Sequence, residues 1–328
     1  MAHQLETGWF AHTPAWHGLG EVKDSRPETW EAARAGHLDW EVQTEPVYRV
    51  QHDPEAGWHD TQPIDGWQRV YRDDSGDTLA LQKDSYAVIG NGEFGNIIEY
   101  AMGVDIPGMP KLAFDTLCVL KQGKLIVTTL YLPEPINIPG DNSQFYRYIN
   151  FWTKHDGTGG LTCGANSLRV VCANTQMSAE NEQNRHGFTF SIRHTRNWAD
   201  KLEQARRAIF SAVASTKTWQ EQAEHLASTR IDDEQMIWFV KKWLPFSDDM
   251  TDVQRNNVSE KRGAFFSAYD SATCDRIKGT AWGLLQAAVE ACDHSFPAHN
   301  LETRVSRILV HGDTYKAKAS RLANALAK

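Results

Sequence analysis

The sequence lacks most of the short motifs that identify an enzyme or a nucleotide-binding protein. It has no Gly-x-x-x-x-Gly-Lys-Ser/Thr phosphate loop and no Gly-x-Ser-x-Gly nucleophile motif. It also has no Cys-x-x-Cys and no His-Glu-x-x-His spacing, which are typical of zinc sites. We therefore expect no cofactor, no ATP hydrolysis and no metal site, and we assign no catalytic residue.

Long apolar runs are also missing. No stretch of about 18 apolar residues occurs, so we expect no segment that spans a membrane. The N-terminal segment has no basic head followed by an apolar run, and we expect no secretory signal there. Cysteine is scarce, and the odd count of five favours free thiols over a disulfide framework. Together these absences predict a cytoplasmic protein.

The charge of the chain is unevenly distributed. The net charge is −8, yet residues 1–100 hold 18 acidic against 7 basic side chains, so the remainder is slightly basic. An acidic total argues against general polyanion binding. Phosphate contact depends on local charge, however, and basic clusters occur at 185–207 and 304–328. A solvated helix face is the commoner explanation of such clusters, and that alternative stays open.

The first 195 residues predict a β-rich α+β domain. Turn residues dominate between 51 and 77, and this stretch separates expected strands at 40–50, 78–82 and 86–89. A helix is expected at 94–102.

The most informative region begins at residue 112. Strands are expected at 114–121, 124–132 and 145–153, with Gln122 and Gly123 in a tight turn between the first two. A glycine-rich turn follows, and then apolar residues recur at helical spacing over about 164–180, including Leu168 and Cys172. We therefore predict an antiparallel sheet with a strand-strand-strand-helix core, in which Leu168 and Cys172 are buried.

The second part of the chain, residues 196–328, predicts a helical region that packs on the first domain or continues it. Apolar stripes near a period of 3.6 residues begin at Trp198. Further helices are expected at 232–244, 251–270, 280–294 and 313–327. Such stripes are typical of helix-packing surfaces.

One strand interleaves aromatic and basic side chains. Alternation places Tyr146, Tyr148 and Trp152 on one face of 144–154 and Arg147 on the other, so at most one face can serve a ligand. Aromatic rings stack on bases, and nearby cations follow the phosphates of a single strand. The candidate DNA-binding residues are Arg147, Tyr148, Trp152, Lys154, Arg169, Arg185, Arg193, Arg196 and Lys201.

Three further segments are distinctive: PAWHGLG at 14–20, SLRVVCANT at 167–175 and GTAWGLLQAAVEACDH at 279–294. They resemble the hallmark blocks of a family of phage and plasmid proteins, domain of unknown function nine-three-two. The Ala291-Cys292 pair departs from the pattern, which has a bulky residue before Asp-His. The resemblance implies residence in phages, plasmids and prophages, and it assigns no reaction. The matching positions are Trp16, His17, Gly18, Gly20, Arg169, Cys172, Asn174, Gly279, Trp282, Gly283, Asp293 and His294.

The expected core is also similar, at the level of the fold, to phage single-strand annealing recombinases. That similarity implies a ring or filament of identical subunits that holds an extended strand in a basic groove. Because a fold does not determine a function, the similarity supports a hypothesis and no more.

The sequence leaves three functional hypotheses. The first is a single-stranded DNA binding and annealing protein that acts in recombination or replication. The second is an enzyme with an unrecognised site near His17 or near Asp293 and His294. The third is a structural or counter-defence protein that acts through protein contacts alone. The absence of a catalytic motif favours the first and the third.

Overall fold

A long curved sheet lies at the centre of the computed structural model, which describes residues 5–12, 20–53, 58–103, 111–169, 174–177, 190–195, 197, 202–296 and 314–328. Its eight strands follow the order β10-β9-β8-β7-β6-β1-β2, and β11 pairs with β9. Among the described strands of this sheet, β1 and β2 are the one parallel pair. The strands are β1 (Leu5–Ala11), β2 (Glu21–Lys23), β6 (Ala113–Leu120), β7 (Leu125–Asn137), β8 (Gln144–Lys154), β9 (Leu161–Arg169), β10 (Asn174–Met177) and β11 (Phe190–Ile192).

The three predicted central strands are confirmed as β6, β7 and β8, consecutive and antiparallel. The turn between β6 and β7 also forms as expected. Lys121, Gln122 and Gly123 adopt φ values of 57°, 56° and 83°, and such a left-handed turn matches the twist of the two strands.

The predicted helix after β8 is wrong. Residues 161–169 form β9, which is antiparallel to β8, and residues 174–177 form β10 beside it. A short apolar run does not distinguish helix from strand by its period, and here the free edge of β8 supplied the hydrogen-bonding partner. Cys172 and the side chain of Leu168 lie outside the described residues, so their predicted burial stays a prediction.

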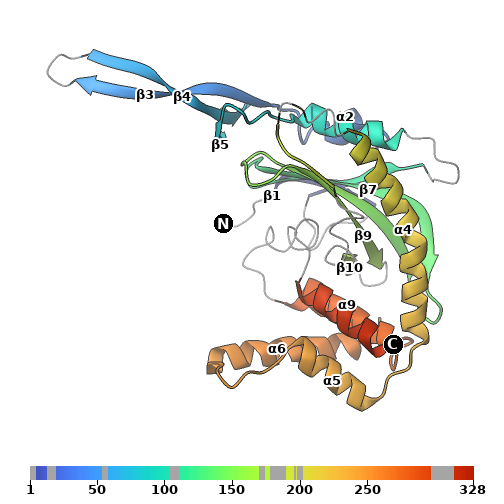
Figure 1. Cartoon of the computed structure of the whole chain (residues 1–328). Helices are drawn as coiled ribbons and strands as arrows, with labels where there is room; N and C mark the ends of the chain where they lie inside the picture. The colour runs from blue at the N-terminus through green and yellow to red at the C-terminus, as the bar shows by residue number, and fades with distance from the viewer. Residues whose placement is uncertain are drawn as a thin grey trace.

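A second, three-stranded sheet projects from the body as an arm (Figure 1). It comprises β3 (Val42–Asp53), β4 (Trp58–Arg72) and β5 (Thr78–Lys83) in that order. The predicted turns are therefore wrong over 51–53 and 58–72, which are strand, and confirmed over 73–77, between β4 and β5, while residues 54–57 lie outside the described residues. The outer part of the arm is a ribbon of β3 and β4 alone, with solvent on both faces. Such a ribbon needs no alternation of apolar and polar residues, so its polar, Pro and Gly residues have the composition of a loop. The expected strand at 86–89 also fails, because Tyr86 makes only an isolated bridge, to Thr195.

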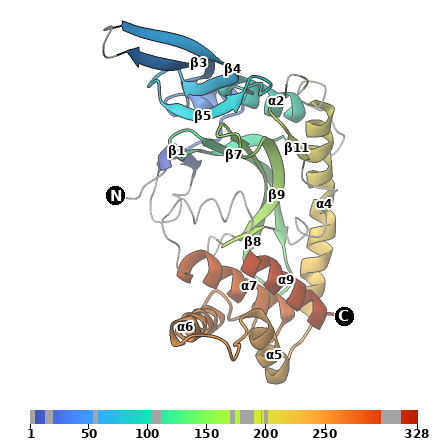
Figure 2. The ribbon, with the colours of Figure 1, turned by 60° about the vertical axis from the view of Figure 1, so that its left-hand side comes forward.

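Two helices pack on one face of the large sheet, and the C-terminal helices form a layer beyond one end of that sheet. Helix α2 (Asn91–Met102) and the short α1 (Trp30–Arg34) cover the face that carries Phe114, Ile126 and Phe151. The long helix α4 (Leu202–Ser228) runs along the sheet to a helical layer (Figure 2). That layer contains α5 (Asp233–Trp243), α6 (Asp252–Tyr269), α7 (Ala281–Glu290), a π-helical turn (Ala291–Ser295) and α9 (Thr314–Leu326).

The four predicted C-terminal helices are thus confirmed, with the helix expected at 280–294 passing into a π-helical turn at its end. The mixed α+β class is confirmed as well, with the sheets in the first part and the helices in the second. Helix α4 joins two hydrophobic cores, since Ile209 packs in the sheet core and Trp219 in the helical one. No helix in the described part of the chain is long and apolar enough to span a membrane.

Candidate nucleic-acid interface

The predicted stacking residues on β8 are buried, which corrects their assignment as contacts for an open strand. Tyr148 is 9 % exposed and Trp152 8 %, and Arg147 is only 1 % exposed. Sequence alternation predicted one covered face, but both faces of β8 are covered. Trp152 packs with Phe10 and Val127, while the Arg147 guanidinium lies 5.5 Å from the ring of Trp219 on α4.

The remaining predicted DNA contacts divide into three groups. Lys154, half-buried, and the exposed Arg193 lie at one end of the large sheet. The backbone of Arg169 lies at the opposite end, because β9 runs antiparallel to β8, and its side chain is outside the described residues. Arg185, Arg196 and Lys201 also lie outside the described residues.

Four cations gather at the first of these ends because of the order of the strands. Strands β6, β8 and β11 finish there, while β7 and β9 begin there. We call this surface the basic end and define it by Lys121, Lys124, Lys154 and Arg193. Lys124, Lys154 and Arg193 form no ion pair with any described residue. Sequence analysis missed Lys121 and Lys124, although their position in the predicted tight turn was the available signal.

A glycine turn at 157–160 lies between two of these cations. A Cβ on Gly159 would stand 3.0 Å from Cδ of Lys154, and a Cβ on Gly160 would stand 3.0 Å from Cα of Arg193. Asp156, the nearby acid in this turn, accepts hydrogen bonds from the backbone N–H and the hydroxyl of Thr158, at 2.9 and 2.6 Å. A side chain at Gly159 or Gly160 would push Lys154 or the residues that end β11 away from the turn. The two glycines therefore allow Lys154 and Arg193 to lie close to the same turn.

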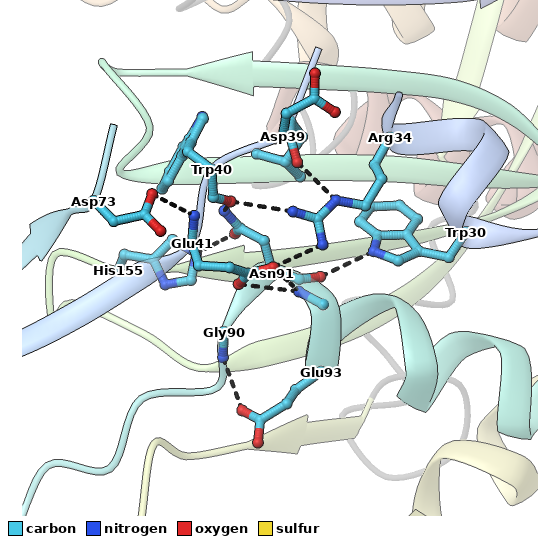
Figure 3. A network of polar contacts seen from close by, with 12 residues as sticks. Trp30, Arg34, Asp39, Trp40, Glu41, Asp73, Gly90, Asn91, Glu93 and His155 are labelled. Carbon is cyan, nitrogen blue, oxygen red and sulfur yellow. Dashed lines mark hydrogen bonds and ion pairs between the residues drawn. The ribbon is translucent and has the colours of Figure 1, made fainter. Parts of the chain in front are cut away.

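A buried polar network begins at the residue next to Lys154 in the chain (Figure 3). His155 follows Lys154 and contacts Asn91 Oδ1 at 3.0 Å through Nε2. Because the oxygen of Asn91 can only accept, His155 carries its proton on Nε2. Asn91 in turn donates to the backbone carbonyl of Trp40, at 3.0 Å. The network thereby fastens the end of β8 to the first turn of α2 and to the segment that precedes the arm.

A second histidine completes this network. The backbone N–H of Ile89 donates to Nδ1 of His194, at 3.1 Å, so His194 also carries its proton on Nε2, toward Thr153. Burial, with a smaller contribution from His194, lowers the pKa of His155 to about 3, and burial lowers the pKa of His194 to about 4. Both rings are therefore neutral near pH 7, and neither contributes charge to the basic end.

The first turn of α2 contains a motif that sequence analysis missed. Gly90, Gly92 and Gly95 form a Gly-x-Gly-x-x-Gly run, the spacing of dinucleotide-binding turns. That reading requires a preceding strand, and none forms at 86–89 among the described residues. Instead the carboxylate of Glu41 accepts from the N–H of Gly92, at 3.0 and 3.2 Å, and the Trp30 ring leaves no room for a Cβ on Gly95. The glycines thus serve contacts within the chain.

Several residues of the family blocks have structural roles. Trp282 is buried and donates from Nε1 to Oδ2 of Asp141, at 3.0 Å, which ties α7 to the loop before β8. Gly283 lies against the carbonyl of Ile277, where a Cβ has no room. Gly20 and Gly279 adopt positive φ values of 75° and 70°. Asn174 begins β10. Trp16, His17, Gly18 and Cys172 lie outside the described residues.

The Asp-His pair of the last block lies in the π-helical turn. Asp293 is buried and forms an ion pair with the equally buried Lys316, whereas His294 is exposed. The two side chains thus face different environments. No cluster of three or more His, Cys, Asp or Glu side chains able to hold a metal occurs among the described residues. Cys118 and Cys163 are free and buried, and Cys274 and Cys292 are buried as well.

Comparison with known proteins identifies the family. No curated protein and no solved structure matches the chain. A family model does match over residues 78–321, a range that includes the blocks at 167–175 and 279–294 and excludes the block at 14–20. Since this range covers most of the chain, the protein belongs to the family described as Domain of unknown function (DUF932).

Proposed function

We propose that the protein binds the backbone of a single DNA strand at the basic end and acts as a single-strand binding and annealing protein of a phage or plasmid. The gathering of Lys121, Lys124, Lys154 and Arg193 at one end of the sheet carries the proposal. Lys124, Lys154 and Arg193 form no ion pair with any described residue, so their charges are available to phosphates, and each such contact releases a condensed counterion.

The size of the basic end suits a short stretch of strand. From β6 to β11 the sheet is five strands wide, which corresponds to about 20 Å at the usual spacing between neighbouring strands. Four cations over this distance match a few consecutive phosphates. Contact through the backbone leaves the bases free to pair with a complementary strand, which annealing requires, and it predicts little sequence preference.

The test is the binding of a labelled single-stranded oligonucleotide, measured by fluorescence anisotropy over a range of salt, without metal or nucleotide. The triple variant Lys124→Gln/Lys154→Gln/Arg193→Gln should bind more weakly. The slope of the logarithm of the binding constant against the logarithm of the salt concentration should be shallower by about 2. Each of the three lost phosphate contacts contributes about 0.7 to that slope. Duplex DNA of the same length serves as the competitor.

A matched control removes the same charge elsewhere. Lys217 on α4 and Lys241 and Lys242 on α5 are exposed and remote from the basic end. Lys217→Gln/Lys241→Gln/Lys242→Gln should keep the affinity and the slope of the unmodified protein. Equal losses in the two triple variants, or no binding by the unmodified protein at low salt, would rule the proposal out.

A second candidate function is a role through protein contacts alone, as a structural or counter-defence protein. The observation that favours it is the arm, where the side chains of Tyr48 and Val50 are 55 % and 64 % exposed. Loss of strand binding together with retained protein contacts would support this candidate instead.

A further inference from the structure

The cations of the basic end do not by themselves select an open strand over a duplex. Each phosphate contact contributes about 0.9 to the slope of binding against salt for B-DNA and about 0.7 for a single strand, so charge alone gives no preference for the open strand. An exposed aromatic ring does give one, because bases within a duplex are already stacked on each other. Tyr148 and Trp152, the predicted stacking residues, are buried and do not supply such a ring.

Trp67 on β4 is an exposed aromatic residue close to the basic end. It is 40 % exposed, although tryptophan is largely buried in most proteins. It pairs with Lys83, the last residue of β5, and both views show β5 at the base of the arm, next to the large sheet (Figures 1 and 2).

The end of β5 touches the glycine turn that lies between two cations of the basic end. Nε2 of Gln82 donates to the backbone carbonyl of Asp156, at 3.5 Å, and the same amide leaves no room for a Cβ on Gly157. Lys83 is the next residue in the chain. The pair of Trp67 and Lys83 is therefore fixed beside the basic end by direct packing.

The strand register determines which way the Trp67 ring points. Gln68 pairs with Gln82, whose side chain points toward the large sheet. Because neighbouring residues of a strand point to opposite faces, Trp67 and Lys83 lie on the outer face of the arm. Both are exposed there, so the ring is accessible from solvent at the edge of the basic end.

A cation lies over this ring. Nζ of Lys83 is 3.9 Å from the ring centroid of Trp67, and Lys83 forms no ion pair with any described residue. The ammonium group thus brings a positive charge to the place where the phosphate next to a stacked base lies. An accessible ring with an adjacent cation is the combination that binds open strands without sequence preference.

Two acidic residues favour a base over a phosphate at the ring itself. Asp65 lies two residues before Trp67, and Asp84 follows Lys83. Both are exposed, and the backbone N–H of Asp84 donates to the carbonyl of Gly66, at 3.2 Å, which holds the two segments together. Carboxylates repel phosphates and leave uncharged bases unaffected. The charges therefore direct the backbone of a strand to the basic end and a base to the ring.

We propose that Trp67 and Lys83 form a stacking site for one unpaired base at the edge of the basic end, and that this site gives the protein its preference for single strands over duplexes. The inference rests on the proposed function and adds a contact that the cations of the basic end do not make. A strand whose phosphates lie along the basic end places one flanking base on Trp67, while its other bases stay free to pair.

The test compares two ligands of equal length by fluorescence anisotropy: an oligothymidylate, and the same sugar–phosphate chain with every base removed. The two carry the same phosphates and differ only in the bases. The unmodified protein should bind the oligothymidylate about tenfold more tightly than the abasic chain, since one stacked base accounts for a difference of that size. The slope of binding against salt should be the same for both ligands, because stacking releases few counterions.

Three variants assign the difference to the ring. Trp67→Leu should bind the oligothymidylate about tenfold more weakly and the abasic chain as tightly as the unmodified protein does. Trp67→Phe keeps an aromatic ring and should recover most of the affinity. The control Trp238→Leu removes a tryptophan that is 38 % exposed on α5, remote from the basic end, and should change neither affinity. Circular dichroism confirms that every variant is folded.

The outcomes separate this inference from the proposed function. If the unmodified protein binds both ligands with the same affinity, or if Trp67→Leu binds the oligothymidylate as tightly as the unmodified protein does, Trp67 is not a stacking site and the proposed function stands on the cations alone. If the unmodified protein binds neither ligand at low salt, the proposed function fails and the stacking site fails with it.

Discussion

His155 donates a hydrogen bond from Nε2 to Oδ1 of Asn91, at 3.0 Å, and this contact joins the end of β8 to the start of α2. The neighbouring His194 has the same tautomer, with its ring centroid 6.0 Å from that of His155. Two neutral histidines therefore lie side by side in the interior, directly behind the cations of the basic end. Protonation of either would place a charge in a buried site.

The first prediction is a loss of stability in mild acid. The pKa of His155 is lowered to about 3 and that of His194 to about 4, below their value near 6.5 in an unfolded chain. The unfolded state then binds more protons below pH 6.5, so the stabilisation is complete above that pH and is lost as the pH falls. Urea unfolding between pH 6.5 and 5 should show a loss that steepens as the pH falls and approaches about 1.4 kcal/mol per histidine for each pH unit near pH 5.

A variant pair assigns this dependence to the buried rings. His155→Gln should flatten the slope of unfolding free energy against pH, whereas His225→Gln, at a residue whose hydrogen bond to Ala327 is exposed, should leave it unchanged. An equal slope in all three proteins would contradict the assignment.

The second prediction concerns the buried ion pair of Lys316 with Asp293, which joins α9 to the π-helical turn. Lys316→Met or Asp293→Leu alone should lower the free energy of unfolding by about 3–5 kcal/mol, because each leaves a buried charge without its partner. The double variant should cost clearly less than the sum of the two. A double-mutant cycle in urea measures the coupling, and additive losses would show that the pair is not coupled.

The third prediction compares two glycines with the same backbone conformation. Gly123 and Gly140 both have φ of +83°, but a Cβ on Gly123 would stand 2.7 Å from the Trp40 ring, whereas one on Gly140 meets nothing within 4 Å. Gly140→Ala should cost about 1–2 kcal/mol for the left-handed backbone alone. Gly123→Ala should cost about 1–3 kcal/mol more, because Trp40 must move. Equal thermal shifts in the two variants would mean that Trp40 adjusts freely.

The fourth prediction concerns the thiols. Burial raises the pKa of Cys118 to about 12 and also raises the pKa of Cys163, so neither forms a thiolate near pH 7. Both should react slowly with a thiol reagent in the folded protein. After denaturation without reductant, all five cysteines of the sequence should titrate as free thiols. A count of three would reveal a disulfide and contradict the expected reducing compartment.

Sequence periodicity predicted the elements whose environment is uniform along their length. The strands β6 and β7 are apolar and buried, and the C-terminal helices carry regular stripes with capping residues such as Asp232 and Thr251. The strands at 40–50 and 78–82 were predicted correctly as β3 and β5, whereas β4 of the arm and β9 were predicted wrongly, for opposite reasons. The arm has too little burial to impose a pattern, and β9 becomes a strand because β8 lies beside it.

The sequence by itself determined the mixed α+β class, the three central strands with their tight turn, and the four C-terminal helices, since each depends on residues close together in the chain. Only the tertiary structure decided which polar residues face solvent. Arg147 and Trp152 have the composition of a binding strand, yet packing on both sides of β8 covers them. Lys121 and Lys124 come from one turn, Lys154 from the end of β8 and Arg193 from just after β11, and only the order of five strands brings them to one end of the sheet. Long-range strand pairing sets that order, and no local pattern encodes it.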